Sequence, residues 1–242
     1  MKKIKGVYLL LLCWLPLAYS QPTASKFFVE VDEFLKKHVN EGRVNYTAIK
    51  QNSTEIKALV SVLNKFDLKN LSDANTELAF WINAYNILVI HAVVANYPIQ
   101  SPVEVKGFFD TQKHTVAGEL LTLNDIENKK VRQKFKDARI HFALGCAARS
   151  CPPIINEAYF GDKLDAQLNA RTRANLNDPK FIRVDKTAKK AYLSEIFRWY
   201  ESDFSASGKT VLEYINLYRA DKIPNTYAVD YYKYDWSLNE YK

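Results

Sequence analysis

The stretch "LAFWINAYNILVIHAVV", residues Leu78–Val94, decides the fold of this chain. A helix drawn through it is apolar on nearly every face, which is the pattern of a helix that is buried in a core or spans a membrane. Asn83, Asn86 and His91 interrupt the apolar run, and the run falls short of the roughly 20 residues that cross a bilayer. We therefore predict a buried central helix.

Local signals set the limits of this helix and of its neighbours. Ser72 is a good N-cap residue and Pro98 ends helical structure, so the central helix is predicted over Asp73–Asn96. Apolar side chains at helical spacing predict further helices. These cover residues 27–39, 54–65, 164–176, 195–204 and 210–219.

Strand-like segments alternate with these helices. Residues 113–123, "KHTVAGELLTL", and 181–194, "FIRVDKTAKKAYLS", each predict a hairpin. "RIHFAL", residues 139–144, predicts a central strand, and the tail "VDYYKYDWSL", residues 229–238, also has strand character. This order predicts an α+β fold: a single domain with a small, mostly antiparallel sheet packed against several helices, including the long buried one.

The first twenty residues have the features of a cleaved signal peptide. Three early lysines precede an apolar segment, Val7–Leu17, and Ala18-Tyr19-Ser20 offers small residues where a signal peptidase reads the chain. Cleavage before Gln21 would export the protein to the periplasm or the medium. The alternative is a lipid anchor on Cys13, which the large residues Leu10-Leu11-Leu12 disfavour.

The predicted mature chain, residues 21–242, is long enough for one domain and carries no second apolar span outside the buried helix. The formal net charge of +7 falls when the signal lysines are removed, and a mildly basic chain does not by itself predict a nucleic-acid partner. The basic run "KKVRQKFKDAR", residues 129–139, is most simply a solvated helix face, with contact to an anionic surface as the alternative.

Cofactor and metal motifs are not found in the sequence. It has no G-x-G-x-x-G, no P-loop and no H-E-x-x-H, and its four histidines are scattered. We therefore predict no cofactor and no metal. The expected partner is an unidentified small molecule or peptide.

"HFALGCAARSCPP", residues 141–153, holds both cysteines of the predicted mature chain. A helical turn after Cys146, with Arg149 close by, would bring N–H groups and positive charge to the thiol and lower its pKa. A disulfide between Cys146 and Cys151 is sterically possible, but so short a loop adds little stability. A functional thiol, a disulfide and two packed free cysteines all stay open.

His141 is the histidine nearest to Cys146 in the sequence. On a straight strand the two side chains point to opposite faces, and only a bend at Gly145 would bring them together. His91 and His114 are the other candidate bases. For His91 and His141, a core histidine bonded to a carbonyl is at least as good an interpretation.

Asn83 and Asn86 lie one turn apart on the apolar helix and can line the same pocket. A buried amide without partners costs roughly 1–3 kcal/mol, so each must bond a loop backbone or a substrate. Either way we expect them beside the Cys146 loop. Glu127 has a structural explanation, because "NDIE" is a capping-box pattern with Asn124 as cap and Glu127 reaching back.

Six stretches, in order, resemble one family: "GRVNY", "FWINAYNILVI", "VAGELLTLNDIE", "RIHFALGCAARSCPP", "LSEIFRWYESDF" and "YDWSLN". The chain resembles the bacterial and plant proteins that share the domain of unknown function 547, from about Gly42 to Asn239. The family carries no established activity, so the resemblance implies a class and not a reaction.

Position by position, the resemblance adds Ser150 to the candidate site and strengthens Glu127 as a candidate acid. The family pattern falls on Asn83, Tyr85, Asn86, Ile126, Glu127, His141, Cys146, Ser150, Pro152, Trp199, Tyr200, Asp203 and Phe204. One position departs from it: relatives usually read Ile-Glu-His where this chain has Asn128. Plant members commonly carry serine at the position of Cys151, so a disulfide there is not general in the family.

Two functions are expected. The first is a cysteine-dependent hydrolase or acyl transferase in which backbone N–H groups after Cys146 form the oxyanion site. Its catalytic candidates are Cys146, His141 and Glu127, and its substrate-binding candidates are Asn83, Asn86 and Ser150. The second is a non-enzymatic ligand- or peptide-binding domain in which Cys146 and Cys151 form a structural disulfide; the absence of the usual histidine at Asn128 favours it.

Overall fold

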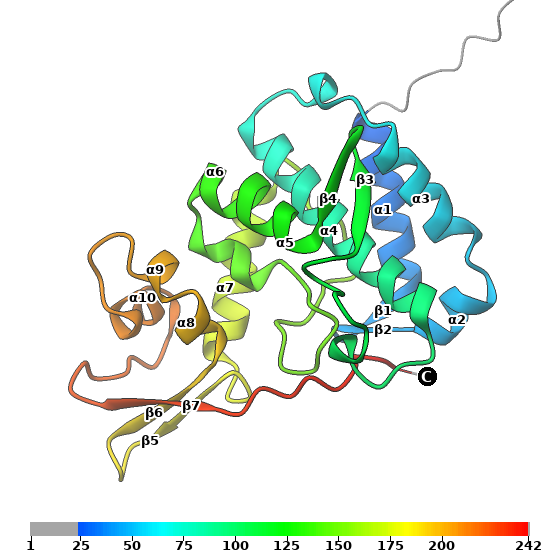
Figure 1. The fold of residues 1–242 in the computed structure, drawn as a ribbon. Helices are drawn as coiled ribbons and strands as arrows, with labels where there is room; N and C mark the ends of the chain where they lie inside the picture. The colour runs from blue at the N-terminus through cyan, green and yellow to red at the C-terminus, as the bar shows by residue number, and fades with distance from the viewer. Residues whose placement is uncertain (1–23, 242) are drawn as a thin grey trace, which may run out of the picture.

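Helix α4 (Ala74–Asn96) lies in the middle of the protein, and the neighbouring helices surround it (Figure 1). The computed structural model describes residues 24–241, so the predicted signal peptide and Cys13 lie outside the described residues. Every residue of 78–94 except His91 is buried, which confirms the predicted central helix. By length and composition α4 resembles a membrane span, but here its apolar surface is covered by protein.

The N-cap of α4 is Asp73 and not Ser72. A side-chain oxygen of Asp73 accepts a hydrogen bond from the backbone N–H of Thr76 at 2.9 Å, and Ser72 donates its hydroxyl to the same carboxylate. The predicted cap was therefore one residue early. A carboxylate in this place also interacts favourably with the positive end of the helix dipole.

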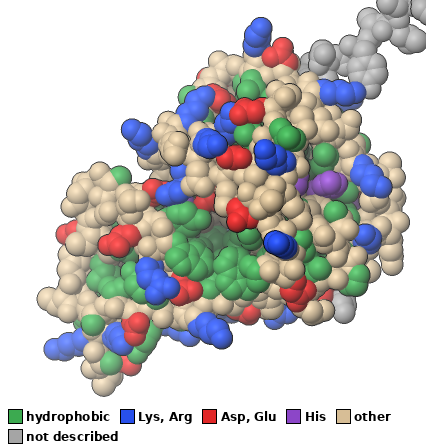
Figure 2. Space-filling view, in the orientation of Figure 1, with side chains coloured by type: hydrophobic (Ala, Val, Ile, Leu, Met, Phe, Trp, Pro, Cys, Tyr) green, Lys and Arg blue, Asp and Glu red, His purple; other side chains and the backbone are tan. Residues whose placement is uncertain are grey.

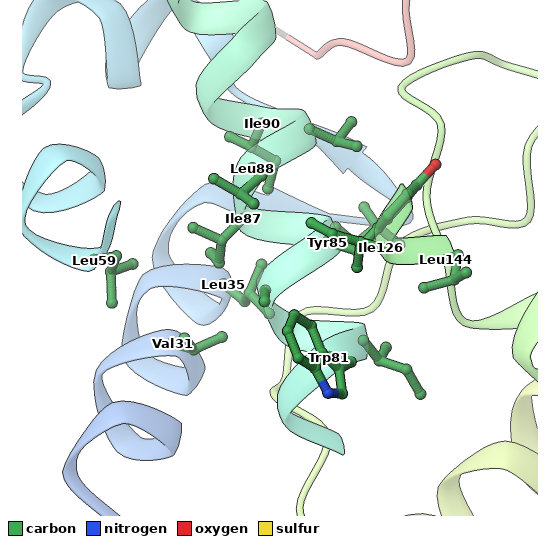
Figure 3. Close-up of a cluster of buried hydrophobic side chains, with 14 of the residues drawn as sticks. Val31, Leu35, Leu59, Trp81, Tyr85, Ile87, Leu88, Ile90, Ile126 and Leu144 are labelled. Atoms are coloured by element: carbon green, nitrogen blue, oxygen red, sulfur yellow. The ribbon is translucent and has the colours of Figure 1, made fainter. Parts of the chain in front are cut away.

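Helices from the N-terminal part of the chain cover one side of α4. Val31 and Leu35 of α1 and Leu59 of α3 point toward Ile87 and its neighbours in Figure 3. These helices are α1 (Ala24–His38), α2 (Tyr46–Gln51) and α3 (Thr54–Asn64), followed by the short 3₁₀ turns η1 (Leu68–Asn70) and, after α4, η2 (Pro102–Glu104). Burial of these aliphatic and aromatic side chains makes the larger of two apolar cores.

Two small hairpins flank this core. Strand β1 (Val39–Asn40) pairs with β2 (Arg43–Val44), and β3 (Lys113–Val116) pairs with β4 (Glu119–Thr122). The second is the hairpin predicted at residues 113–123, and it turns at Ala117-Gly118. In the first, Gly42 has a φ of +77° and a Cβ there would lie 2.2 Å from the Cβ of Pro153, so only glycine fits against the segment that follows Cys151.

A second apolar core lies beside the first. The predicted hairpin at 181–194 forms β5 (Ile182–Asp185) and β6 (Lys190–Ser194), and β7 (Ala228–Tyr232) adds to β6 in parallel. Two sheets of two strands, one sheet of three strands and the surrounding helices make an α+β fold, as predicted. The helices of this part are α7 (Leu164–Asn177), α8 (Ile196–Trp199), α9 (Glu201–Phe204) and α10 (Val211–Tyr218).

The prediction of a central strand at residues 139–144 was wrong. This segment forms the 3₁₀ helix η4 (Ala138–Phe142), with the side chain of Asp137 accepting a hydrogen bond from the N–H of Arg139. A short buried apolar run has the same composition in a strand and in a helical turn, and periodicity cannot separate them. The expected opposite orientation of His141 and Cys146 therefore loses its premise.

The predicted capping box at "NDIE" was displaced by two residues. Thr122 is the cap of α5 (Leu123–Asp125), and Asp125 closes the box, because strand β4 ends at Thr122 and the chain turns into the helix there. The chain continues as a π-helix, η3 (Ile126–Arg132), and then as α6 (Gln133–Phe135). Glu127 is thus not needed for capping.

The tail after β7 closes the molecule. Leu238 forms an antiparallel bridge with Ala148, and the N–H of Asn239 donates to the carbonyl of Ala147 at 2.9 Å. On its other side the tail reaches β2, where the N–H of Val44 donates to the carbonyl of Asn239 at 3.0 Å. The tail therefore fixes the loop that carries Cys146 to the first hairpin.

Candidate functional site

A cavity of about 470 Å³ lies where α4, η3, α8, the loop after Phe142 and the C-terminal tail meet. Figure 2 shows a hollow in this face with hydrophobic side chains around it. The polar side chains in the lining come from distant parts of the chain. They are Tyr85, Lys106, Asp110, Asn124, Glu127, His141, Cys146, Cys151, Tyr200 and Tyr234.

Asn86 holds the loop that leads to Cys146. Its amide nitrogen donates to the carbonyl of Ala143 at 3.0 Å, and its amide oxygen accepts from the N–H of Gly145 at 2.8 Å. Both bonds are buried, so the helix α4 and the loop are joined by two hydrogen bonds without water competition. This confirms the expected place of Asn86 beside the loop, with its amide committed to backbone.

The expectation that Asn83 bonds the Cys146 loop was wrong: Asn83 bonds the backbone at Tyr159, and Ser150 bonds the backbone of the tail. The amide of Asn83 donates to the carbonyl of Tyr159 at 2.8 Å and accepts from its N–H at 3.0 Å. The hydroxyl of Ser150 accepts from the N–H of Asp235 at 2.9 Å. Neither Asn83 nor Ser150 lines the cavity, so in this structure both position chain segments around it.

Cys146 lines the cavity as a free thiol. The expected helical turn after it is not formed: Ala147 has a φ of +60°, and a turn closed by the bond from Cys151 N–H to Ala148 carbonyl follows. A left-handed non-glycine residue is uncommon and often marks a functional loop. The side chain of Arg149, expected near the thiol, is exposed.

The surroundings of the Cys146 sulfur favour its thiolate. Burial opposes ionisation, but hydrogen bonds from Cys151, from the Tyr234 hydroxyl at 3.2 Å and from the N–H of Ala148 outweigh it and lower the pKa of the Cys146 thiol. The negative charge of Glu127 acts in the opposite direction. Hydrogen bonds to the charged form are the usual way in which a buried thiol is activated.

Cys151 behaves differently from Cys146. It is buried and also free, and its sulfur accepts a hydrogen bond from the N–H of Cys146 at 2.8 Å. Burial, together with the neighbouring Cys146, raises the pKa of the Cys151 thiol. Of the two thiols, Cys146 therefore has the lower pKa, and the Cys151 side chain stabilises its thiolate by a hydrogen bond.

His141 belongs to a charged network on the opposite part of the cavity lining. Its Nε2 lies 2.8 Å from a carboxylate oxygen of Asp203, and Arg132 donates two hydrogen bonds to that carboxylate at 2.7 and 3.1 Å. His141, followed by Arg132, holds the pKa of Asp203 far below its usual range, so Nε2 is the donor in this bond. The imidazole stacks on the ring of Tyr200 with centroids 4.1 Å apart.

No hydrogen bond between His141 and Cys146 is found within residues 24–241, although both line the same cavity. The hydrogen-bonded partner of the thiol is instead Tyr234, from the C-terminal tail. His91 and His114 do not line this cavity.

Glu127 is buried in the cavity floor. Its carboxylate accepts a hydrogen bond from the Tyr85 hydroxyl at 3.4 Å, and burial together with Glu127 raises the pKa of the Tyr200 hydroxyl beside it. Glu127 lies in the π-helix η3, and π-helical segments recur at functional sites because they displace side chains from their α-helical positions. Here the carboxylate faces α4 and the cavity.

Asn128, where the sequence departs from the family pattern it resembles, lies in the π-helix η3. It accepts a hydrogen bond from Arg132 and donates one to the carbonyl of Asn124 at 2.9 Å. It therefore supports the network of His141 and Asp203 through Arg132. Asn128 does not line the cavity itself.

The predicted oxyanion site formed by backbone N–H groups after Cys146 is largely occupied by other bonds. The N–H groups of Arg149 and Ser150 donate to carbonyls of the tail, and that of Cys151 donates to Ala148. In the described range 24–241, no cluster of three or more metal-ligating side chains occurs. The Tyr234 hydroxyl, which no sequence pattern singled out, lies 3.2 Å from the Cys146 sulfur.

The fold and the site together define an α+β domain that presents a free thiol in an aromatic-walled cavity. Residues 68–176 match the model of a family described as "Protein of unknown function, DUF547". The match contains the helix α4 and the Cys146 loop, and it confirms the predicted family. No curated protein and no solved structure matched the chain.

Proposed function

We propose that the protein is an exported cysteine-dependent hydrolase or acyl transferase with Cys146 as its nucleophile. One observation carries the proposal: the Cys146 sulfur lines a cavity and accepts hydrogen bonds that favour its thiolate, from Tyr234 and from the N–H of Ala148. The thiolate is the nucleophilic form of cysteine, and a cavity of this size accommodates a small-molecule substrate.

In the proposed reaction, the Cys146 thiolate attacks the carbonyl carbon of an ester, thioester or amide. The carbon–sulfur bond forms as the carbonyl electron pair moves to oxygen, and the Tyr234 hydroxyl donates to that oxyanion. When the carbonyl re-forms, the leaving group departs with a proton from protonated His141. Water or an acceptor nucleophile then attacks the thioester, gives its proton to His141 and releases the thiolate.

Asp203 is a positioning residue in this scheme. Its carboxylate binds Nε2 of His141 and is itself held by Arg132, so the imidazole has a fixed orientation. The role of His141 is to exchange protons with the leaving group and with water. This division agrees with a structure in which the thiol has its own hydrogen-bond donors.

Alkylation tests the nucleophile. The folded protein, purified without reductant, is treated with iodoacetamide at pH 7 and its intact mass and peptides are measured. We expect one carbamidomethyl group, on Cys146, and none on buried Cys151. A Cys151→Ser variant serves as the matched control and keeps the labelling, while Cys146→Ser loses it.

Absence of labelling together with a mass two hydrogens lower would overturn the nucleophile and favour the alternative, a ligand- or peptide-binding domain with a Cys146–Cys151 disulfide. Turnover is measured separately with 4-nitrophenyl esters, and Cys146→Ala should reduce it to the rate without enzyme. The N-terminal residue of the mature protein, found by mass spectrometry, tests export: Gln21 is expected.

A further inference from the structure

Glu127 is a buried carboxylate without an ion-pair partner among residues 24–241. Its side chain lines the cavity, and the residue is only 7% exposed. Its hydrogen-bond partners are two neutral hydroxyls, that of Tyr85 at 3.4 Å and that of Tyr200. A buried charge is normally paired, because removing it from water costs several kcal/mol unless another charge or several hydrogen bonds compensate.

The cations around Glu127 are committed elsewhere or lie at the cavity mouth. Arg132 donates to both carboxylate oxygens of Asp203 and to Asn128. Lys130 pairs with Glu119. Lys106 also lines the cavity, but its side chain is exposed and forms no ion pair with Glu127.

The walls above Glu127 are aromatic. Trp199 and Trp236 stack with centroids 5.9 Å apart, and the ring of Tyr234 lies 4.9 Å from the first and 4.8 Å from the second. Trp199 is 42% exposed, so this cluster is open to an incoming ligand. All three rings line the cavity.

Aromatic faces and an unpaired carboxylate suit one chemical class of ligand. A substituted ammonium group is attracted by the π-faces of tryptophan and tyrosine and has a low cost of desolvation compared with a metal ion. An anionic ligand would be repelled by Glu127 and by the Cys146 thiolate. A neutral apolar ligand would leave the buried carboxylate uncompensated.

We propose that this cavity binds an organic cation, a primary or quaternary ammonium group held by Glu127 between the aromatic rings. This inference rests on the proposed function: the cation is then part of the substrate, and the bond to be cleaved lies at Cys146 in the same cavity. The substrate class is then an ester or amide whose acyl part carries an ammonium group.

Binding is tested first, independently of catalysis, by calorimetry and by the fluorescence of Trp199 and Trp236 at pH 7.5. Choline and 3,3-dimethylbutan-1-ol have the same shape and differ in charge. We expect choline to bind at least tenfold more tightly to the unmodified protein. Ethanolamine distinguishes the source of the affinity: tighter binding than choline indicates a primary ammonium ligand, and weaker binding indicates a quaternary one.

Two variants distinguish an effect of the buried Glu127 carboxylate from a general attraction of cations to negative charge around the cavity. Glu127→Gln should reduce the preference for choline over its neutral analogue to less than twofold, while Asp110→Asn, which removes an exposed charge from the same cavity lining, should leave it unchanged within twofold. Trp199→Leu, at an exposed site, should weaken the binding of choline more than the binding of the neutral analogue. The proposal is overturned if the unmodified protein binds choline and 3,3-dimethylbutan-1-ol equally, or if Glu127→Gln keeps the full preference for choline.

Turnover is tested with two esters of matched shape. These are the 4-nitrophenyl esters of 4-(trimethylammonio)butyrate and of 5,5-dimethylhexanoate. We expect kcat/KM at least tenfold higher for the cationic ester, with the difference lost in Glu127→Gln. If both esters react equally, the cation proposal fails and the hydrolase remains; if choline binds but neither ester reacts faster than with Cys146→Ala, the hydrolase fails and the cation site remains.

Discussion

The cavity lining holds one buried histidine and the corner between α4 and β3 holds two half-buried ones, and the two regions surround the imidazole in opposite ways. In the cavity, His141 has a carboxylate partner at 2.8 Å, and that carboxylate has an arginine partner. In the corner, Nδ1 of His91 and Nε2 of His114 are buried without a hydrogen-bond partner among the described residues.

The difference shows what separates a candidate site from a packed histidine. Burial lowers the pKa of His91, and it lowers that of His114 to about 4, with His91 as a second cause, so the corner favours neutral rings. The cavity instead collects groups that stabilise charge, at Asp203 and at the Cys146 thiolate. The partners of a buried polar group therefore indicate function better than burial does.

The largest effect is expected from Asn86→Ala, which breaks the cavity side of the comparison. The change removes two buried hydrogen bonds and leaves the carbonyl of Ala143 and the N–H of Gly145 unpaired. We expect the free energy of unfolding to fall by about 3 kcal/mol, measured by urea denaturation. Asn96→Ala, which loses only a bond to its own helix, should cost less than about 0.5 kcal/mol.

The corner is tested by pH. Because the folded pKa of His114 is depressed to about 4, the unfolded chain binds its proton first, and the stability from a neutral His114 is complete above pH 6.5 and lost as the pH falls toward 4. After allowance for the partial exposure of His114 to water, we expect this effect to lower the free energy of unfolding by about 2 kcal/mol.

His114→Gln should remove this part of the acid sensitivity. Urea denaturation of both proteins at pH 7, 5.5 and 4.5 isolates it, since the carboxylates that also titrate near pH 4 are common to the two. Parallel pH profiles would contradict a neutral His114. The positive charge of Lys57 also contributes to lowering the pKa of His91.

Tyr234→Phe tests how far the Tyr234 hydroxyl stabilises the Cys146 thiolate in the cavity. Loss of the hydroxyl removes a hydrogen bond that lowers the pKa of the Cys146 thiol, so the pKa should rise. A hydrogen bond to a charged group is worth about 1.5 kcal/mol or more, which corresponds to roughly tenfold slower alkylation by iodoacetamide at pH 7. Tyr231→Phe, on strand β7 and outside the cavity lining, should alkylate at the original rate.

The smallest effect is expected from Glu127→Gln, and it has the opposite sign. The charge of Glu127 raises the pKa of the Cys146 thiol, so its removal should lower that pKa and speed alkylation by roughly two- to threefold at a pH below it. The pH profile of alkylation measures the change. A midpoint that moves upward would show that Glu127 supports the thiolate in another way.

Local sequence signals were sufficient for the elements that bury one clear face. The apolar run of α4 and the hairpins at residues 113–123 and 181–194 each depend on neighbours within a few positions, and all were predicted correctly. Residues 139–144 failed because a short buried run carries no period. The place of Asn86 followed from the cost of burying an amide without partners.

The site itself was predicted only in part, because its contacts join distant residues. Cys146, His141 and Glu127 all line one cavity, but the bonds between Cys146 and Tyr234 and between His141 and Asp203 span 88 and 62 positions. No local pattern encodes such pairs. An unexplained aromatic tail was the one signal that pointed to Tyr234.

Because the tail that bridges Ala148 and Val44 is synthesised last, the site around Cys146 cannot assemble until the chain is nearly complete. The thiol emerges from the ribosome 88 residues before the hydroxyl that is its partner, and the loop around it lacks its carbonyl acceptors until residues 235–239 follow. A nascent chain therefore carries no assembled cavity. If the chain crosses a membrane unfolded, the thiol acquires its reactivity only on the far side.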